Sequence, residues 1–83
     1  MHDQPQDIDE LRGRIDRIDR TLLDLWHERS GLSRKIGEAR VASGGTRLVL
    51  SREQQVLARF KSSLGDDGVA LALLLLRAGR GPL

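Results

Sequence analysis

Residues 8–41 read IDELRGRIDRIDRTLLDLWHERSGLSRKIGEARV, and this stretch decides the fold. Its apolar residues recur at alternating intervals of three and four, at Ile8, Leu11, Ile15, Ile18, Leu22, Leu25, Leu32, Ile36 and Ala39. We call this set the apolar seam, and its period is typical of an amphipathic helix. No proline interrupts the run, although three glycines weaken it locally. We predict one helix from about Ile8 to about Val41.

The length of this helix predicts a second chain. About 34 residues at 1.5 Å each span roughly 50 Å. A compact chain of this size has a radius of gyration of only about 12 Å. The apolar seam therefore extends beyond any single globule and must pack against another protomer. A homodimer is the simplest closed assembly.

The second half of the chain predicts two shorter helices. Residues 42–45 (ASGG) signal a loop. Ser51 followed by Gln54 resembles a capping box, which would start a helix ending at about Ser63. After a turn over residues 64–68, a third helix is expected from about Asp67 to Arg77, with Gly79 ending it. The expected fold is all-α, a single domain over residues 1–83 with residues 1–7 and 80–83 as flexible tails.

Composition excludes several classes of protein. There is no cysteine and there are only two histidines, so neither a thiolate nor a histidine metal site is expected. The formal net charge of +2 does not suit a nucleic-acid binder. The apolar run over residues 71–76 is too short to cross a membrane, and residues 1–6 do not resemble a signal peptide. We expect a cytoplasmic protein without metal or cofactor.

One residue breaks the apolar seam. After Leu22 and Leu25 the next seam position is Arg29, followed by Leu32. A buried guanidinium without an anion is costly, so an anionic group should meet it. One interpretation is a structural ion pair or a polar residue that fixes the helix register. The other is an anion pocket inside the helical bundle.

Further arginines favour the anion pocket. Arg40 follows Arg29 by eleven residues, on nearly the same helix face and about 16 Å along the axis. Arg52 falls in the first turn of the second helix, with Glu53 as the one neighbouring acid. Arg12 lies about 25 Å from Arg29 along the helix, but the partner's Arg12 can reach that site in an antiparallel dimer.

The remaining charged residues suggest no conventional chemistry. Four arginines lie off the apolar seam among acids, as expected of a solvated face; they are Arg14, Arg17, Arg20 and Arg34. The excess of arginine over lysine fits either a GC-rich genome or carboxylate recognition. No serine has a paired base, and no glycine-rich phosphate loop follows a strand. An enzyme with this sequence would need neither nucleophile nor metal.

Several blocks, in this order and spacing, resemble the all-α chorismate mutases, and in particular their short actinobacterial type. The blocks are residues 8–12 (IDELR), 15–19 (IDRID), 22–25 (LLDL), 28–29 (ER), 33–40 (SRKIGEAR), 42–49 (ASGGTRLV), 51–53 (SRE) and 73–81 (LLLLRAGRG). The resemblance covers residues 8 to about 81. It implies a three-helix protomer in an intertwined homodimer with two equivalent sites, which rearranges chorismate to prephenate for aromatic amino acid synthesis.

The resemblance also implies roles for particular residues. Arg29 and Arg12 of the partner subunit would hold carboxylates of the substrate, with Arg52 near the ring carboxylate. Arg40 matches a position where many relatives carry a lysine that contacts a carboxylate and the ether oxygen. Glu53 would accept a hydrogen bond from the ring hydroxyl.

Two positions depart from the family pattern. Val49 stands where better-known relatives have an acid, and Arg80 is the candidate for the place of a glutamine on the last helix. In the short type, such departures imply activation by a partner, 3-deoxy-D-arabino-heptulosonate-7-phosphate synthase. The alternatives are an isochorismate-pyruvate lyase of the same fold and a non-catalytic helical interaction module.

Overall fold

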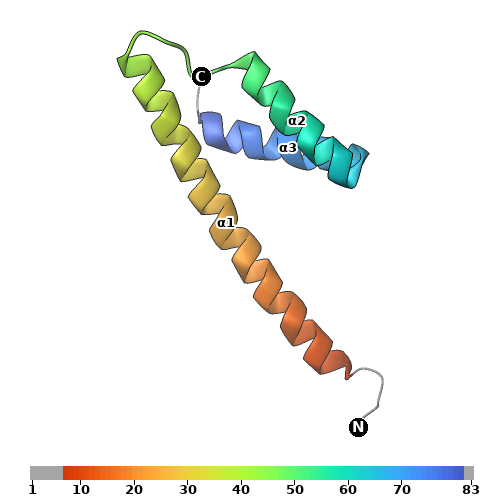
Figure 1. Ribbon diagram of the computed structural model, residues 1–83. Helices are drawn as coiled ribbons and strands as arrows, with labels where there is room; N and C mark the ends of the chain where they lie inside the picture. Colours follow the sequence, from red (N-terminus) through yellow and green to blue (C-terminus); the bar gives the residue numbers. More distant parts are fainter. Residues whose placement is uncertain (1–6, 82–83) are drawn as a thin grey trace.

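The computed structural model describes residues 7–81 and forms three α-helices, without any strand in that range. In chain order they are α1 (Ile8–Ala42), α2 (Leu50–Leu64) and α3 (Asp66–Arg80). Helix α1 is a long rod, and α2 and α3 form a hairpin beside its C-terminal half (Figure 1). The all-α prediction and the single long N-terminal helix are confirmed.

Both ends of helix α1 lie within one residue of their predicted positions, because local capping signals mark each of them. The Asp7 carboxylate accepts hydrogen bonds from the backbone N–H groups of Asp9, at 2.9 Å, and Glu10, at 3.5 Å. Asp7 is therefore a helix cap and not part of a flexible tail; residues 1–6 lie outside the described range. At the other end, the Ser43 N–H donates to the carbonyl of Ala39, and Gly44 takes a positive φ of 92°.

The predicted capping box at Ser51 is wrong. Helix α2 begins one residue earlier, at Leu50, after Val49 in extended conformation. The Val49 carbonyl accepts from the N–H groups of Arg52 and Glu53, and no side chain caps this helix. Ser51 is thus the second residue inside the helix, where its hydroxyl no longer occupies the capping position.

Helix α3 is longer at both ends than predicted. Only Gly65, with a φ of 68°, separates it from α2, and it continues through Gly79 to Arg80. Gly79 does not stop the helix. It is buried against α1, and a Cβ there would lie 2.5 Å from the Ser33 Oγ. Gly81, again with a φ of 68°, ends the helix instead. Arg80 is consequently helical, contrary to the predicted tail over residues 80–83; residues 82–83 lie outside the described range.

Helix α3 holds the other two helices apart. It packs against both α1 and α2, whereas no Cα atom of α1 lies within 8 Å of one in α2. Helix α3 also approaches α2 closely: Gly68 faces the Phe60 carbonyl, and there is no room for a Cβ between them. The space between α1 and α2, beside α3, is where the candidate site lies.

A single chain does not bury a sizeable core. Among the described residues only Val56, Ala72 and Leu75 are buried hydrophobic residues. The radius of gyration is 17.6 Å and the extents are 62 × 23 × 17 Å, against a radius of about 12 Å for a compact chain of this length. On the apolar seam, Ile18 and Leu22 are each 59% exposed. The predicted second protomer would cover this surface.

We predict that a charge on the apolar seam dissociates the dimer. Ile18→Asp should give particles near the 9.2 kDa mass of one chain and lose helical signal, because α1 then has no apolar partner. Light scattering after size exclusion and far-ultraviolet circular dichroism measure both effects. Arg20→Asp, two residues on and on the opposite helix face, should leave the dimer intact. Equal behaviour of the two variants would contradict a dimer formed through the apolar seam.

A second prediction concerns the contact between α3 and α1. Gly79→Ala should lower the free energy of unfolding by about 1–3 kcal/mol, because the new methyl group overlaps Ser33. Gly31→Ala is the matched control: no atom lies within 4 Å of its Cβ position, so it should gain about 0.5–1 kcal/mol from helix propensity. Urea denaturation at one protein concentration measures both. A Gly79→Ala variant as stable as Gly31→Ala would show that this close approach is not required.

Candidate active site

One cavity of about 530 Å³ lies where the C-terminal half of α1, residue 49, the first turns of α2 and the end of α3 meet. It is lined by Arg29, Leu32, Ser33, Arg34, Ile36, Gly37, Glu38, Arg40, Arg47, Val49, Arg52, Glu53, Val56, Leu76, Gly79, Arg80 and Gly81. All the candidate site residues predicted from one chain are in this set. Arg12 is not among them.

The lining is strongly cationic. It contains six arginines and two glutamates, a formal excess of four positive charges. Val49, Val56, Leu32 and Leu76 supply apolar wall between the charged groups. Nowhere in residues 7–81 do three or more acids, histidines or cysteines gather as they would around a metal ion. Planar guanidinium groups in a partly apolar cavity suit an organic anion with more than one carboxylate.

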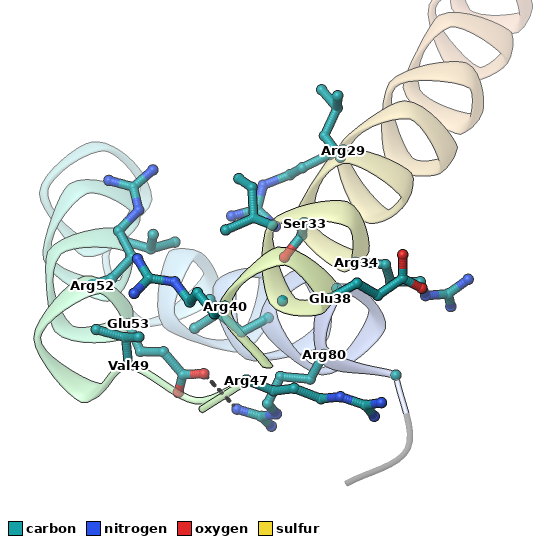
Figure 2. A pocket seen from close by; sticks show the side chains of 17 residues that line it. Arg29, Ser33, Arg34, Glu38, Arg40, Arg47, Val49, Arg52, Glu53 and Arg80 are labelled. Atoms are coloured by element: carbon teal, nitrogen blue, oxygen red, sulfur yellow. Dashed lines mark hydrogen bonds and ion pairs between the residues drawn. The ribbon is translucent and has the colours of Figure 1, made fainter. Parts of the chain in front are cut away.

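Arg29 enters the cavity from the middle of α1 (Figure 2). Its side chain is partly buried, and Nη1 donates to the Leu75 carbonyl of α3 at 3.4 Å. This single long contact uses one of the five guanidinium N–H donors. Within the described part of the chain Arg29 pairs with no carboxylate, so an ion pair inside one protomer does not account for it.

Arg40 and Arg52 come from opposite sides of the cavity, the last turn of α1 and the first turn of α2. Figure 2 shows both side chains extending into the space that Arg29 also faces. Arg52 Nη1 donates to the Gln55 Oε1 at 3.4 Å. Neither arginine forms an ion pair with any residue between 7 and 81. Three guanidinium groups are therefore available to an anion in the cavity.

Glu53 is already paired. Its Oε2 lies 2.7 Å from the Arg80 Nη1, and the two side chains are only 19% and 25% exposed. The pair joins the first turn of α2 to the last turn of α3 (Figure 2). From the sequence, Arg80 was predicted only to take the place of a glutamine that relatives carry on the last helix. Its contact with Glu53 follows from the continuation of α3 past Gly79, which local helix signals did not indicate.

Two further arginines at the cavity were missed. Arg34 was assigned to the solvated face; it is exposed, yet it also lines the cavity, and its Nε lies 3.7 Å from the Cβ position at Gly81. Arg47 packs its aliphatic carbons against Gly37. Neither residue belongs to the apolar seam, so periodicity could not identify them. Both are rim residues whose place depends on how the 43–49 loop and the end of α3 fold back on α1.

Arg12 is exposed on the N-terminal half of α1, which projects beyond α2 and α3 (Figure 1). It therefore makes no contribution to the cavity of its own chain. That it reaches the cavity of a second protomer stays a prediction.

The chain is similar to several known proteins. The family model for chorismate mutase type II matches residues 11–74. A relative from Mycobacterium tuberculosis, named intracellular chorismate mutase, is 55% identical over 84 aligned residues, which cover 100% of this chain and 79% of the relative. One of the same name from Mycolicibacterium smegmatis is 51% identical over 81 residues, covering 98% and 78%.

A solved structure from Corynebacterium glutamicum is also similar. It is a non-covalent complex of DAHP synthase and chorismate mutase with a bound transition state analogue. The match has a TM-score of 0.87 and 46% sequence identity, and it covers 92% of each chain.

Proposed function

This chain belongs to the type II chorismate mutases, and from that premise we propose that the cationic cavity between α1 and α2 is the site that rearranges chorismate to prephenate. The observation that carries the proposal is the set of three guanidinium groups, from Arg29, Arg40 and Arg52, that face one cavity without carboxylate partners in residues 7–81. Chorismate is a dianion with two carboxylates. Its two carboxylates would be the anionic partners that these guanidinium groups lack within the described chain.

Five lining residues and Arg12 of the partner subunit have roles in this proposal. Arg29 and Arg12 of the partner subunit bind carboxylates of the substrate, and Arg52 adds a contact near the ring carboxylate. Arg40 binds a carboxylate and the ether oxygen. Glu53 accepts a hydrogen bond from the ring hydroxyl, and Val49 contributes apolar wall. No metal and no cofactor takes part.

The reaction breaks the ether C–O bond and forms a C–C bond within one molecule, without proton transfer or a covalent enzyme intermediate. It requires a compact conformer in which the two reacting ends meet. Fixed cations on both carboxylates select that conformer and remove its entropic cost from the chemical step. As the C–O bond breaks, negative charge grows on the ether oxygen. A guanidinium directed at that oxygen binds the transition state more strongly than the substrate.

Magnitudes indicate that these two effects suffice. A millionfold acceleration corresponds to a barrier lower by about 8 kcal/mol. One donor placed at a developing negative charge contributes roughly 3 kcal/mol, and correct orientation of reacting groups contributes about 7 kcal/mol or more in favourable cases. Together they exceed the requirement without any nucleophile. Cationic groups held in fixed positions are therefore sufficient for the proposed catalysis.

Assembly completes the proposal. The exposed apolar seam supports an intertwined homodimer with two equivalent sites, in which Arg12 crosses from one protomer to the other. Since the similar C. glutamicum structure is a complex with DAHP synthase, we propose the corresponding synthase as an activating partner in the cytoplasm. None of the described helices has the length and apolarity to cross a membrane. The lyase and the non-catalytic module gain no support from the family match.

The test is a chorismate-disappearance assay with identification of the product. The wild-type dimer should form prephenate, and Arg40→Ala should lower turnover about a hundredfold while remaining dimeric, because the charge at the ether oxygen is lost. Arg77→Ala, an exposed arginine near the end of α3 outside the cavity, should retain wild-type turnover. Unchanged turnover in Arg40→Ala would remove its assigned role. Pyruvate as the product would favour the lyase.

We further predict that the synthase raises activity. Titration with the DAHP synthase of the same organism should increase kcat/KM for chorismate about tenfold or more, within the range of typical coupling between sites. Light scattering measures formation of the complex, and loss of chorismate absorbance measures the reaction rate. A complex that forms without a change in kcat/KM would contradict activation.

A further inference from the structure

The end of α3 brings a cation to Glu53, one of the two carboxylates that share the cavity with the unpaired arginines. Arg80 Nη1 lies 2.7 Å from Glu53 Oε2, and both side chains are at least three-quarters buried. Charge-assisted hydrogen bonds of this length are about twice as strong as neutral ones. Partial burial strengthens the attraction further, because the effective dielectric constant is lower than in water.

Two other cationic side chains at the cavity could pair with Glu53. Arg40 and Arg52 line the same cavity, and neither pairs with a carboxylate anywhere in the described chain. A carboxylate released from Arg80 would be attracted to one of these groups. That pairing would neutralise a charge needed by the carboxylates of the substrate. Which arginine pairs with Glu53 therefore determines how many unpaired guanidinium groups the cavity presents to the substrate.

The backbone around Arg80 favours a fixed position for its side chain. The preceding residue, Gly79, is buried against Ser33 of α1, with no room for a Cβ. The following residue, Gly81, ends the helix with a φ of 68°. Arg80 thus projects from a helical turn clamped on α1, and its guanidinium reaches α2 (Figure 2). A side chain on a rigid element loses little further freedom when it pairs.

We propose that Arg80 is a positioning residue: it holds the Glu53 carboxylate away from Arg40 and Arg52, so that these two guanidinium groups stay available to the substrate. The inference rests on the proposed function of the cavity. Arg80 acts through Glu53 and makes no contact with the substrate in this account. This role differs from that of a residue that hydrogen-bonds the substrate directly from the last helix.

A double-mutant cycle between Arg80→Met and Glu53→Gln tests the proposal in the full-length dimer. Arg80→Met should lower kcat/KM for chorismate about tenfold, mainly by raising KM, because a released Glu53 competes with the substrate for the arginines. In the Glu53→Gln background, where the carboxylate at position 53 can no longer compete, Arg80→Met should change kcat/KM less than about twofold. Arg80→Lys keeps the positive charge and should restore most of the activity.

Controls separate this role from a structural one and from the proposed function itself. Arg77→Met, three residues earlier on the exposed side of α3, should keep wild-type KM. Should Arg80→Met fail to fold, Arg80→Gln replaces it in the cycle, and its KM increase should likewise vanish in the Glu53→Gln background. An undiminished effect of either Arg80 variant in that background would overturn the proposal, as would wild-type KM in Arg80→Met. A wild-type enzyme that forms no prephenate would instead refute the function.

Discussion

The structure depends on one mismatch of length: a helix of 35 residues carries its apolar seam past two helices of 15 residues each. The short helices cover only the C-terminal half of α1, so the rest of the seam has no partner in its own chain. Removing apolar surface from water is the main driving force of folding. A chain with three buried hydrophobic residues in its described part is expected to obtain most of that force by association. Folding and dimer formation are therefore expected to be one equilibrium.

The same mismatch explains where the cavity lies. Because α3 packs against both other helices, and no Cα atom of α1 lies within 8 Å of one in α2, a space remains between α1 and α2. Side chains from both helices enter that space. Arg29 stands at a seam position, where a monomer would have no use for a charge. The Leu75 carbonyl accepts one hydrogen bond from this guanidinium, and a bound anion would offset more of the cost of placing it there.

Six arginines around one cavity repel each other, and this repulsion lowers the stability of the empty site. Of the two glutamates in the lining, Glu53 forms an ion pair with an arginine of the cavity, Arg80. The arrangement separates two tasks that identical side chains perform. Arg80 pairs with Glu53, and in the proposed function Arg29, Arg40 and Arg52 would bind the carboxylates of the ligand. Geometry, and not residue type, assigns each task.

Features that depend on neighbours three or four residues apart could be predicted from the sequence. It gave the span of α1, the all-α class, the break at Arg29 and the shared face of Arg29 and Arg40, because helix periodicity is a local property. Only the tertiary structure decided the start of α2, the passage of α3 through Gly79, and the places of Arg34, Arg47 and Arg80 at the cavity. From local sequence alone, Gly79 is typical of a helix end. In the structure its missing side chain instead leaves room for Ser33 of α1. Contacts of that kind join residues far apart in the chain, so their physical cause is packing between helices, which no local pattern encodes.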